Sequence, residues 1–372
     1  MRQREALRFL WRQGRLSRWE LHEQTGVNPN AVGLDVADLL NRGIVRECPS
    51  TPHRPGRPRV PLEIDPERRH VVGVSLEPHR AEAGRLNLRG ELLGKINAKE
   101  VEDPDKVVAA ARRLCTELID ERTLAIGLST TGWVDQTRHS FSAALPGRRA
   151  VSLKPIYEAA SDLPIILEND MHALAARWLL AHHNEAREDV LLVYIGDGQL
   201  GAAILIDGHP NRGSASGANE LGHTRFFVET DLCFCGHTGC LERICSTPFL
   251  HRRGGPDGTL LERSRAFDGS DAPVAAVINY LAMALANAVN FIRPNRLVLV
   301  SELTRCPAFC DQLTRLVRSR LLVEALEHLR LDVWDQPATQ SAENAGWLAL
   351  ASLYREGWAG ENARVVNATT VE

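Results

Sequence analysis

The 372-residue sequence predicts an α/β protein with a small helical domain and a β-wing at its amino end, followed by a larger body of two α/β lobes. Signals that start and stop helices are concentrated in residues 1–52. Residues 53–68 are rich in Arg and Pro and form an arm or linker, and strand and helix patterns then alternate over residues 69–357. Residues 358–372 follow no such pattern and are predicted to be a flexible tail.

Two short helices are predicted close together near the amino end. Ser17 and Glu20 form a capping box, in which each side chain satisfies a backbone amide of the other, and this starts a helix that ends at about Thr25. Asn28 is a good N-cap for a second helix over residues 29–41, which has Pro at its first position and apolar residues on one face. The pattern is that of a helix-turn-helix.

A helix over residues 2–13 and a β-prone stretch at residues 44–46 extend this pattern to a winged helix-turn-helix, whose second short helix would enter the major groove of DNA. Residues 1–60 carry 11 Arg against 6 acidic residues, a local charge of +5, although the whole chain carries −3. A basic amino end on an acidic body predicts operator DNA as a partner. An Arg-rich helix face in solvent would give the same charge, so the local helix pattern decides between the two.

The helix over residues 29–41 contains no Lys or Arg and carries Asp35 and Asp38. Base contacts are therefore expected from Asn28 and Asn30. The side chains expected to contact phosphates or the minor groove are Arg18, Arg42, Arg54, Arg57 and Arg59. The last three belong to the arm at residues 53–68, for which a minor-groove arm and a plain linker remain alternatives.

One His and three Cys are spaced as ligands of a single metal ion. His223 is followed by Cys233, Cys235 and Cys240, which offers one imidazole and three thiolates to a tetrahedral zinc ion in a closed, structural site. A lone Cys usually packs as a small apolar residue. Three Cys within eight residues, interleaved with Gly, instead predict zinc.

The remaining five Cys are scattered without a disulfide framework, which is typical of a reducing cytoplasm. No run of 18 apolar residues and no signal segment is visible in the sequence. We therefore expect a cytoplasmic protein with no membrane partner.

At the His/Cys cluster and at Glu168-Asn169-Asp170 the chain resembles the ROK family, which joins sugar kinases with sugar-responsive repressors. The resemblance extends over the chain apart from the tail, and it implies that the two lobes have the actin-like, ribonuclease H-like ATPase fold. It also implies a carbohydrate site made of Asn169, Asp170, Glu220 and Glu242. Capping of a helix is the alternative role for Asn169 and Asp170, because both types are common at helix starts.

The segments that correspond to the nucleotide site of ROK kinases differ from the family pattern. Residues 75–79 read Ser-Leu-Glu-Pro-His in place of Asp-x-Gly-Gly-Thr, and residues 196–201 place Asp197 where a polyphosphate would lie. Residues 300–303 lack the glycines of the adenosine loop. These departures from the family pattern predict no kinase activity and no catalytic residue. Asp170 would be a vestigial form of the base that ROK kinases use. Ala144 also replaces an Asn that would bind the sugar.

The sequence therefore predicts a sugar-responsive transcriptional regulator, most simply a repressor, that binds operator DNA and is released by a sugar or sugar phosphate. Structural zinc is the expected cofactor, and the resemblance implies a homodimer or homotetramer. Two alternatives remain: an active ROK sugar kinase with an added DNA-binding domain, and a DNA-binding or scaffolding protein that responds to no ligand.

Overall fold

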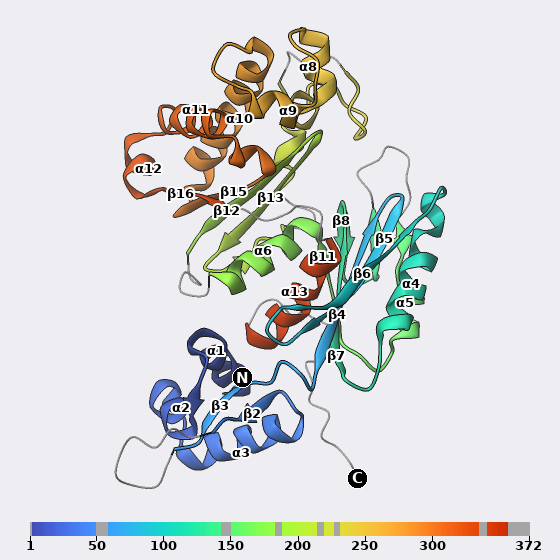
Figure 1. Cartoon of the computed structure of the whole chain (residues 1–372), viewed down its shortest axis with the longest axis vertical. Helices are drawn as coiled ribbons and strands as arrows, with labels where there is room; N and C mark the ends of the chain where they lie inside the picture. The colour runs from blue at the N-terminus through green and yellow to red at the C-terminus, as the bar shows by residue number, and fades with distance from the viewer. Residues whose placement is uncertain are drawn as a thin grey trace. The chain divides into compact units, whose positions relative to one another are not determined.

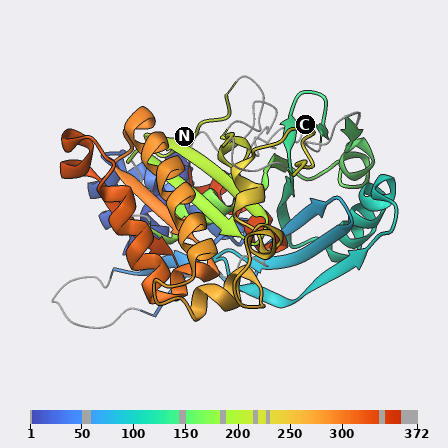
Figure 2. The ribbon, with the colours of Figure 1, turned by 90° about the horizontal axis from the view of Figure 1, so that it is seen from above.

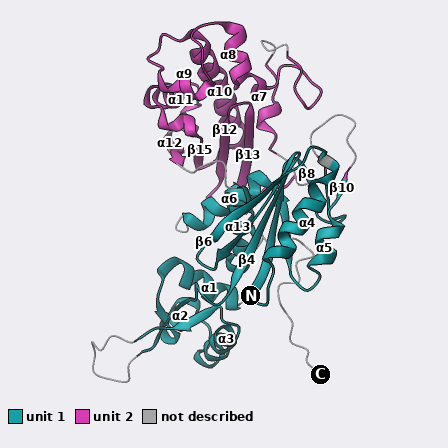
Figure 3. Cartoon of the chain, turned by 45° about the vertical axis from the view of Figure 1, so that its right-hand side comes forward, with its two compact units in different colours: residues 1–141, 151–184, 341–372 teal, residues 142–150, 185–340 magenta. Residues whose placement is uncertain are grey.

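A computed structural model describes residues 2–49, 59–142, 150–182, 188–213, 219–226, 231–334 and 341–355. The chain forms two compact units (Figure 3). Unit 1 comprises residues 1–141, 151–184 and 341–372, and unit 2 comprises residues 142–150 and 185–340. The division confirms two α/β parts, but it is not sequential, because the last helix of the chain returns to unit 1 and the winged domain belongs to the same unit.

The amino-terminal domain of unit 1 has the predicted helices and a three-stranded antiparallel wing (Figure 1). Its elements are α1 (Arg2–Gln13), β1 (Leu16–Ser17), α2 (Arg18–Thr25), α3 (Pro29–Asn41), β2 (Val45–Glu47) and β3 (Pro61–Ile64). Both predicted caps are present: the Ser17–Glu20 capping box at α2 and the Asn28 side chain at α3. Local hydrogen bonding thus fixes where both helices begin.

The wing extends beyond the predicted boundary at residue 52. Strand β3 lies inside the segment 53–68 that was assigned to an arm or linker, and it pairs with both β1 and β2. Leu62 and Ile64 alternate with half-buried positions and are buried in the domain core. The Arg- and Pro-rich composition concealed this strand, because Pro61 stands at its first residue, where a missing amide is tolerated.

The rest of unit 1 is built on a five-stranded sheet in the order β11-β7-β4-β5-β6. Its strands are β4 (His70–Glu77), β5 (Arg80–Asn87), β6 (Leu92–Glu100), β7 (Thr123–Thr130) and β11 (Ile165–Asn169). A small sheet in the order β10-β9-β8 contains β8 (Trp133–Asp135), β9 (Ser140–Ser142) and β10 (Val151–Ser152). The helical elements are η1 (Pro104–Lys106), α4 (Val107–Leu118), α5 (Lys154–Ala159), α6 (Asp170–Ala181) and α13 (Ser341–Tyr354).

Helix α13 packs directly on the backbone of the sheet, and its side chains are buried along its length. A Cβ atom at Gly73 of β4 would lie 2.0 Å from the carbonyl oxygen of Ala342, and one at Gly127 of β7 would lie 1.7 Å from that of Ala345. Only glycine permits this approach. Helices α4 and α5 contribute to a separate apolar cluster with the strands.

Unit 2 contains a second five-stranded sheet, in the order β14-β13-β12-β15-β16. Its strands are β12 (Val190–Gly196), β13 (Gln199–Ile206), β14 (His209–Pro210), β15 (Arg296–Val300) and β16 (Arg330–Trp334). Its helical elements are η3 (Leu221–His223), α7 (Leu241–Ile244), α8 (Thr247–Arg253), α9 (Leu260–Arg265), α10 (Ala272–Ile292), η4 (Glu302–Arg305), α11 (Pro307–Arg318) and α12 (Val323–His328). Figure 2 shows α10 and α11, in orange, beside the green strands of this sheet.

Helix α10 is long and apolar enough to cross a membrane by length and composition alone. It is the one described helix that meets this criterion, and 56% of its most apolar window is buried inside the protein. Val277, Ile278, Leu281 and Leu285 of this helix belong to the core of unit 2. Burial in that core accounts for the apolar character of α10.

Candidate metal centre and binding residues

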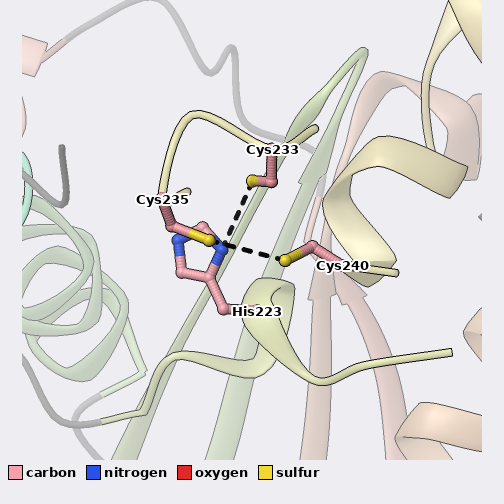
Figure 4. Close-up of side chains that lie close together, drawn as sticks. All are labelled: His223, Cys233, Cys235 and Cys240. Atoms are coloured by element: carbon pink, nitrogen blue, oxygen red, sulfur yellow. Dashed lines mark hydrogen bonds between the residues drawn. The ribbon is translucent and has the colours of Figure 1, made fainter. Parts of the chain in front are cut away.

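The loop between η3 and α7 folds tightly around His223 and the three cysteines. Gly236 and Gly239 have φ angles of 87° and 86°, a left-handed conformation that favours glycine. The backbone amide of Cys233 donates to the carbonyl oxygen of His237 over 2.7 Å, which closes the turn that carries Cys235. Figure 4 shows the four side chains pointing toward one another.

The four ligand atoms have the spacing that a tetrahedral metal site requires. One ligand atom from each of His223, Cys233, Cys235 and Cys240 lies within 4.8 Å of all the others. The His223 Nδ1 to Cys233 Sγ distance is 3.8 Å, and the Sγ atoms of Cys235 and Cys240 are 3.6 Å apart. Zinc–sulfur bonds of about 2.3 Å in a tetrahedron place two sulfurs about 3.8 Å apart. The residues therefore fit zinc, as their spacing predicted.

Burial favours the neutral, metal-binding form of the imidazole, but it also favours thiols over the thiolates that bind metal. Burial lowers the pKa of His223, which favours the neutral ring that binds metal. Burial raises the pKa values of Cys233 and Cys240, which favours the protonated thiols. A bound divalent ion reverses this preference, since its charge stabilises the thiolates.

Two predicted sugar-binding residues of unit 2 flank His223. Glu220 Oε2 lies 3.9 Å from His223 Nε2, and Glu242 Oε2 lies 3.9 Å from His223 Nδ1. Glu242 is buried at the start of α7, and its Oε1 accepts a hydrogen bond from the Leu200 amide over 3.1 Å. Both carboxylates therefore lie beside the imidazole of the His/Cys cluster.

The other two predicted sugar-binding residues, Asn169 and Asp170, lie in unit 1 where β11 meets α6. The Asn169 side chain accepts a hydrogen bond from the Met171 amide and donates one to the carbonyl oxygen of Gly132, both over 2.8 Å. Asn169 is thus the N-cap of α6, the alternative role named above. Asp170 is the first residue of the helix, and its Oδ1 also accepts from the Met171 amide.

Beneath this junction lies a buried polar cluster that was not predicted from the sequence. Glu168 is fully buried, and its two carboxylate oxygens contact Gln136 Nε2 at 3.0 Å and His172 Nδ1 at 3.1 Å. Glu168 lies near the end of β11 and His172 in the first turn of α6, so the strand-to-helix junction brings the two side chains together. Gln136 is remote in sequence, so only the fold shows its part in the cluster.

The predicted DNA-binding residues that the structure describes lie in the winged domain, and several already have intramolecular partners. Asn30 is exposed on α3. Arg18 pairs with Glu47 over 2.9 Å and Arg42 with Asp38 over 3.3 Å. The Arg59 guanidinium lies 5.6 Å above the ring of Trp19. Arg54 and Arg57 fall outside the described residues.

Two segments that were compared with the nucleotide loops of ROK kinases in the sequence, residues 75–79 and 196–201, make internal hydrogen bonds. Pro78 and His79 form the tight turn between β4 and β5, and the carboxylate of the preceding Glu77 accepts from the Ser341 hydroxyl over 3.0 Å. In unit 2, the Asp197 carboxylate accepts hydrogen bonds from the amide and the hydroxyl of Thr247 at the start of α8. Ala144 lies outside the described residues.

A winged helix-turn-helix in front of a two-unit α/β body with a His/Cys metal loop defines the class of protein. The profile of the ROK family matches residues 96–354, and the chain belongs to that family. This confirms the predicted fold class, a winged helix-turn-helix followed by a two-lobed, actin-like ROK domain.

Two named repressors match most of the chain. A putative xylose repressor of Caldicellulosiruptor sp. is 24% identical over 86% of this chain and 87% of its own length. The N-acetylglucosamine repressor of Escherichia coli O157:H7 is 24% identical over 80% of this chain and 79% of its own length.

Solved structures show the same fold. A ROK family transcriptional regulator, described as a homologue of the Escherichia coli MLC protein, has a TM-score of 0.79 at 20% identity and covers 96% of both chains. A ROK hexokinase from Thermus thermophilus has a TM-score of 0.59 at 24% identity and covers 75% of this chain and 97% of its own. The regulator thus matches a larger share of this chain than the kinase does.

Proposed function

We propose that this protein is a sugar-responsive transcriptional repressor that acts in the cytoplasm, binds operator DNA through its winged domain and leaves it when a sugar or sugar phosphate binds. One observation carries the proposal: two relatives that match 86% and 80% of the chain are named as a putative xylose repressor and an N-acetylglucosamine repressor. A glucokinase of Halalkalibacterium halodurans, by contrast, matches only 47% of the chain.

Loss of phosphoryl transfer is part of this proposal. Pro78 has no amide to offer a phosphate, and the carboxylate of Glu77 stands at the same turn. The Asp197 carboxylate accepts a hydrogen bond from the Thr247 amide at the start of α8. Its negative charge would repel a polyphosphate. Phosphoryl transfer depends on positioning and neutralising the phosphates, so the retained Asp170 cannot support this reaction alone.

Sugar recognition would use polar side chains of the ROK domain. We assign Asn169, Asp170, Glu220 and Glu242 to hydroxyls of the sugar, because carboxylates and amides are the groups that bind polyols. Zinc held by the His/Cys loop would act indirectly. It would fix the loop on either side of His223 and so maintain the spacing of Glu220 and Glu242.

Release from DNA would follow from a shift in population. A sugar changes operator affinity only to the extent that it binds one conformation of the protein better than another. In a homodimer or homotetramer, paired winged domains contact half-sites spaced by about 34–36 Å per helical turn. A small change in their spacing would therefore lose several phosphate contacts together.

The test is fluorescence anisotropy with labelled DNA from upstream of the protein's own gene, at fixed salt because phosphate contacts dominate such affinities. The sugar panel contains xylose, glucose, N-acetylglucosamine and their phosphate esters. Specific binding that one sugar reverses is the expected result. Specific binding that no sugar changes would favour a ligand-independent DNA-binding protein, and magnesium-dependent ATP turnover with any hexose would favour the kinase.

A further inference from the structure

One tryptophan of the winged domain packs directly on the α/β body of unit 1. Near the end of α1, the Trp11 ring stacks on Tyr354, with centroids 4.8 Å apart and planes at 29°, and meets Trp347 edge-on at 5.8 Å and 87°. Its Nε1 donates a hydrogen bond to the carbonyl oxygen of Leu180 over 3.0 Å. The Arg89 guanidinium lies 5.9 Å from the ring. Trp11 therefore has both a polar and an aromatic anchor on the body.

The surface that receives Trp11 is rigid. Trp347 fills the space above Gly90, where a Cβ atom would lie 2.2 Å from the indole ring. The Tyr354 hydroxyl donates to the carbonyl oxygen of Leu88 over 2.8 Å, and Tyr354 is almost fully buried. Both rings are thus held by the turn between β5 and β6. A change in their position requires movement of α13 as a whole.

The same two helices lead back to the proposed sugar-binding residues. Helix α6 begins at Asp170 and rises about 15 Å along its axis to Leu180, whose carbonyl accepts the hydrogen bond from Trp11. Arg177 of α6 joins α13 through Glu343 Oε1 at 2.8 Å and Asn344 Oδ1 at 3.0 Å. A displacement of the amino end of α6 is therefore transmitted to both anchors of Trp11.

We infer that Trp11 is the positioning residue through which sugar binding at Asp170 changes the placement of the DNA-binding domain, by way of α6 and α13. The inference rests on the proposed function and names its route of regulation. The Trp11 contacts are made in one conformation of the body and weakened in the other. Their differential strength then supplies the coupling free energy between sugar and operator.

The experiment measures the coupling factor, which is the operator dissociation constant with saturating sugar divided by the constant without it. The probe is whichever panel sugar releases the wild-type protein. Typical coupling is about 5- to 150-fold. We expect Trp11→Ala to bring the factor close to one and Trp11→Phe, which keeps the stacking but loses the indole N–H, to give an intermediate value. Phe291→Ala, which removes a 91% exposed aromatic side chain of unit 2, is the matched control and should keep the wild-type factor.

The outcomes separate the inference from the proposed function. A wild-type protein that no sugar releases would contradict the proposed function itself. A wild-type protein that is released, with Trp11 variants that bind the operator more weakly but keep the full coupling factor, would show a merely structural role and overturn the inference. If Trp11→Ala does not fold, Trp11→Phe and Arg89→Met test the inference instead, because both variants retain an aromatic ring stacked on Tyr354. Unchanged coupling factors in both variants would overturn the inference.

Discussion

Arg177 of α6 and Glu343 of α13 form a buried ion pair, with 2.8 Å between Nη2 and Oε1 and side chains only 12% and 10% exposed. Burial lowers the pKa of Arg177 and raises that of Glu343, so each charge depends on the other. Such a pair adds little net stability, but breaking it is costly because an unpaired charge remains. The Arg177–Glu343 pair instead sets the position of α6 against α13.

We expect Arg177→Met to lower the free energy of unfolding by about 3 kcal/mol at pH 7. Burial raises the folded-state pKa of Glu343 above its unfolded value of about 4.5. Its protonated form is therefore favoured by folding, and the penalty grows as pH rises through the folded pKa. The deficit of the variant should accordingly shrink between pH 7 and pH 4.5, as followed by urea unfolding.

The double variant Arg177→Met with Glu343→Gln is the control for this pair. Without either charge, most of the lost stability should return, and the stability of the double variant should no longer depend on pH through this pair. A single variant as stable as wild type at pH 7 would mean that water reaches Glu343 freely.

Gly127→Ala should destabilise unit 1 by more than about 3 kcal/mol, because the new Cβ would lie 1.7 Å from a backbone oxygen of α13 and something must move. Gly33→Ala in α3 is a matched control, since its Cβ meets nothing within 4 Å and Ala favours a helix by about 1 kcal/mol. Thermal unfolding of both variants tests the pair of expectations. Equal melting temperatures would rule out the close packing of α13 on the sheet.

Elements with local signals were predictable from the sequence. Helices α1 and α3 span the residues predicted for them, and α2 begins at its predicted capping box. Strand β3 was hidden by its Pro-rich context. The role of α13 in unit 1 depends on Gly73 and Gly127, which lie more than two hundred residues away along the chain, and no local pattern encodes such a contact.

The candidate sites also divide into those that local sequence predicts and those that only the fold reveals. The His/Cys loop was predictable because its ligands fall within residues 223–240 and their spacing is set by local turns. The fold alone brings together the residues of two other contacts. One is the hydrogen bond between Gln136 and Glu168, and the other is the stacking of Trp11 on Tyr354. Only the structure could show them.

The stability of the wing should depend on pH through Glu63. Its hydrogen bonds to Arg15 and Arg46 outweigh burial and lower its pKa from 4.5 to about 2. Since the folded pKa is depressed, this stabilisation is complete above pH 4.5 and is lost as pH falls toward 2, and it amounts to about 2 kcal/mol. Glu63→Gln should therefore lose about this amount at pH 6 and less at pH 3, by urea unfolding. A deficit that is the same at both pH values would contradict the ionic origin.

Removal of zinc should weaken both stability and sugar response. Cys235→Ala deletes one of four ligands, and we expect unit 2 to lose about 3 kcal/mol, since metal binding free energy is folding free energy. Sugar affinity should fall as well, because Glu220 and Glu242 flank His223. Cys310→Ala, outside the cluster, is the control. Unchanged melting and unchanged sugar response after complete chelation would count decisively against this role.

The salt dependence of operator binding distinguishes an arm from a linker at residues 53–58. If Arg54 and Arg57 contact phosphates, replacing both with Ala should reduce the slope of log affinity against log salt by about 0.9 for each lost contact. Arg113→Ala, which alters an exposed arginine of α4, should leave the slope unchanged. A linker would give the wild-type slope in all variants, because its arginines release no counterions from DNA. Arg18 and Arg42 already pair with acidic residues, and a loss of one to two units would assign one or two phosphate contacts to the arm.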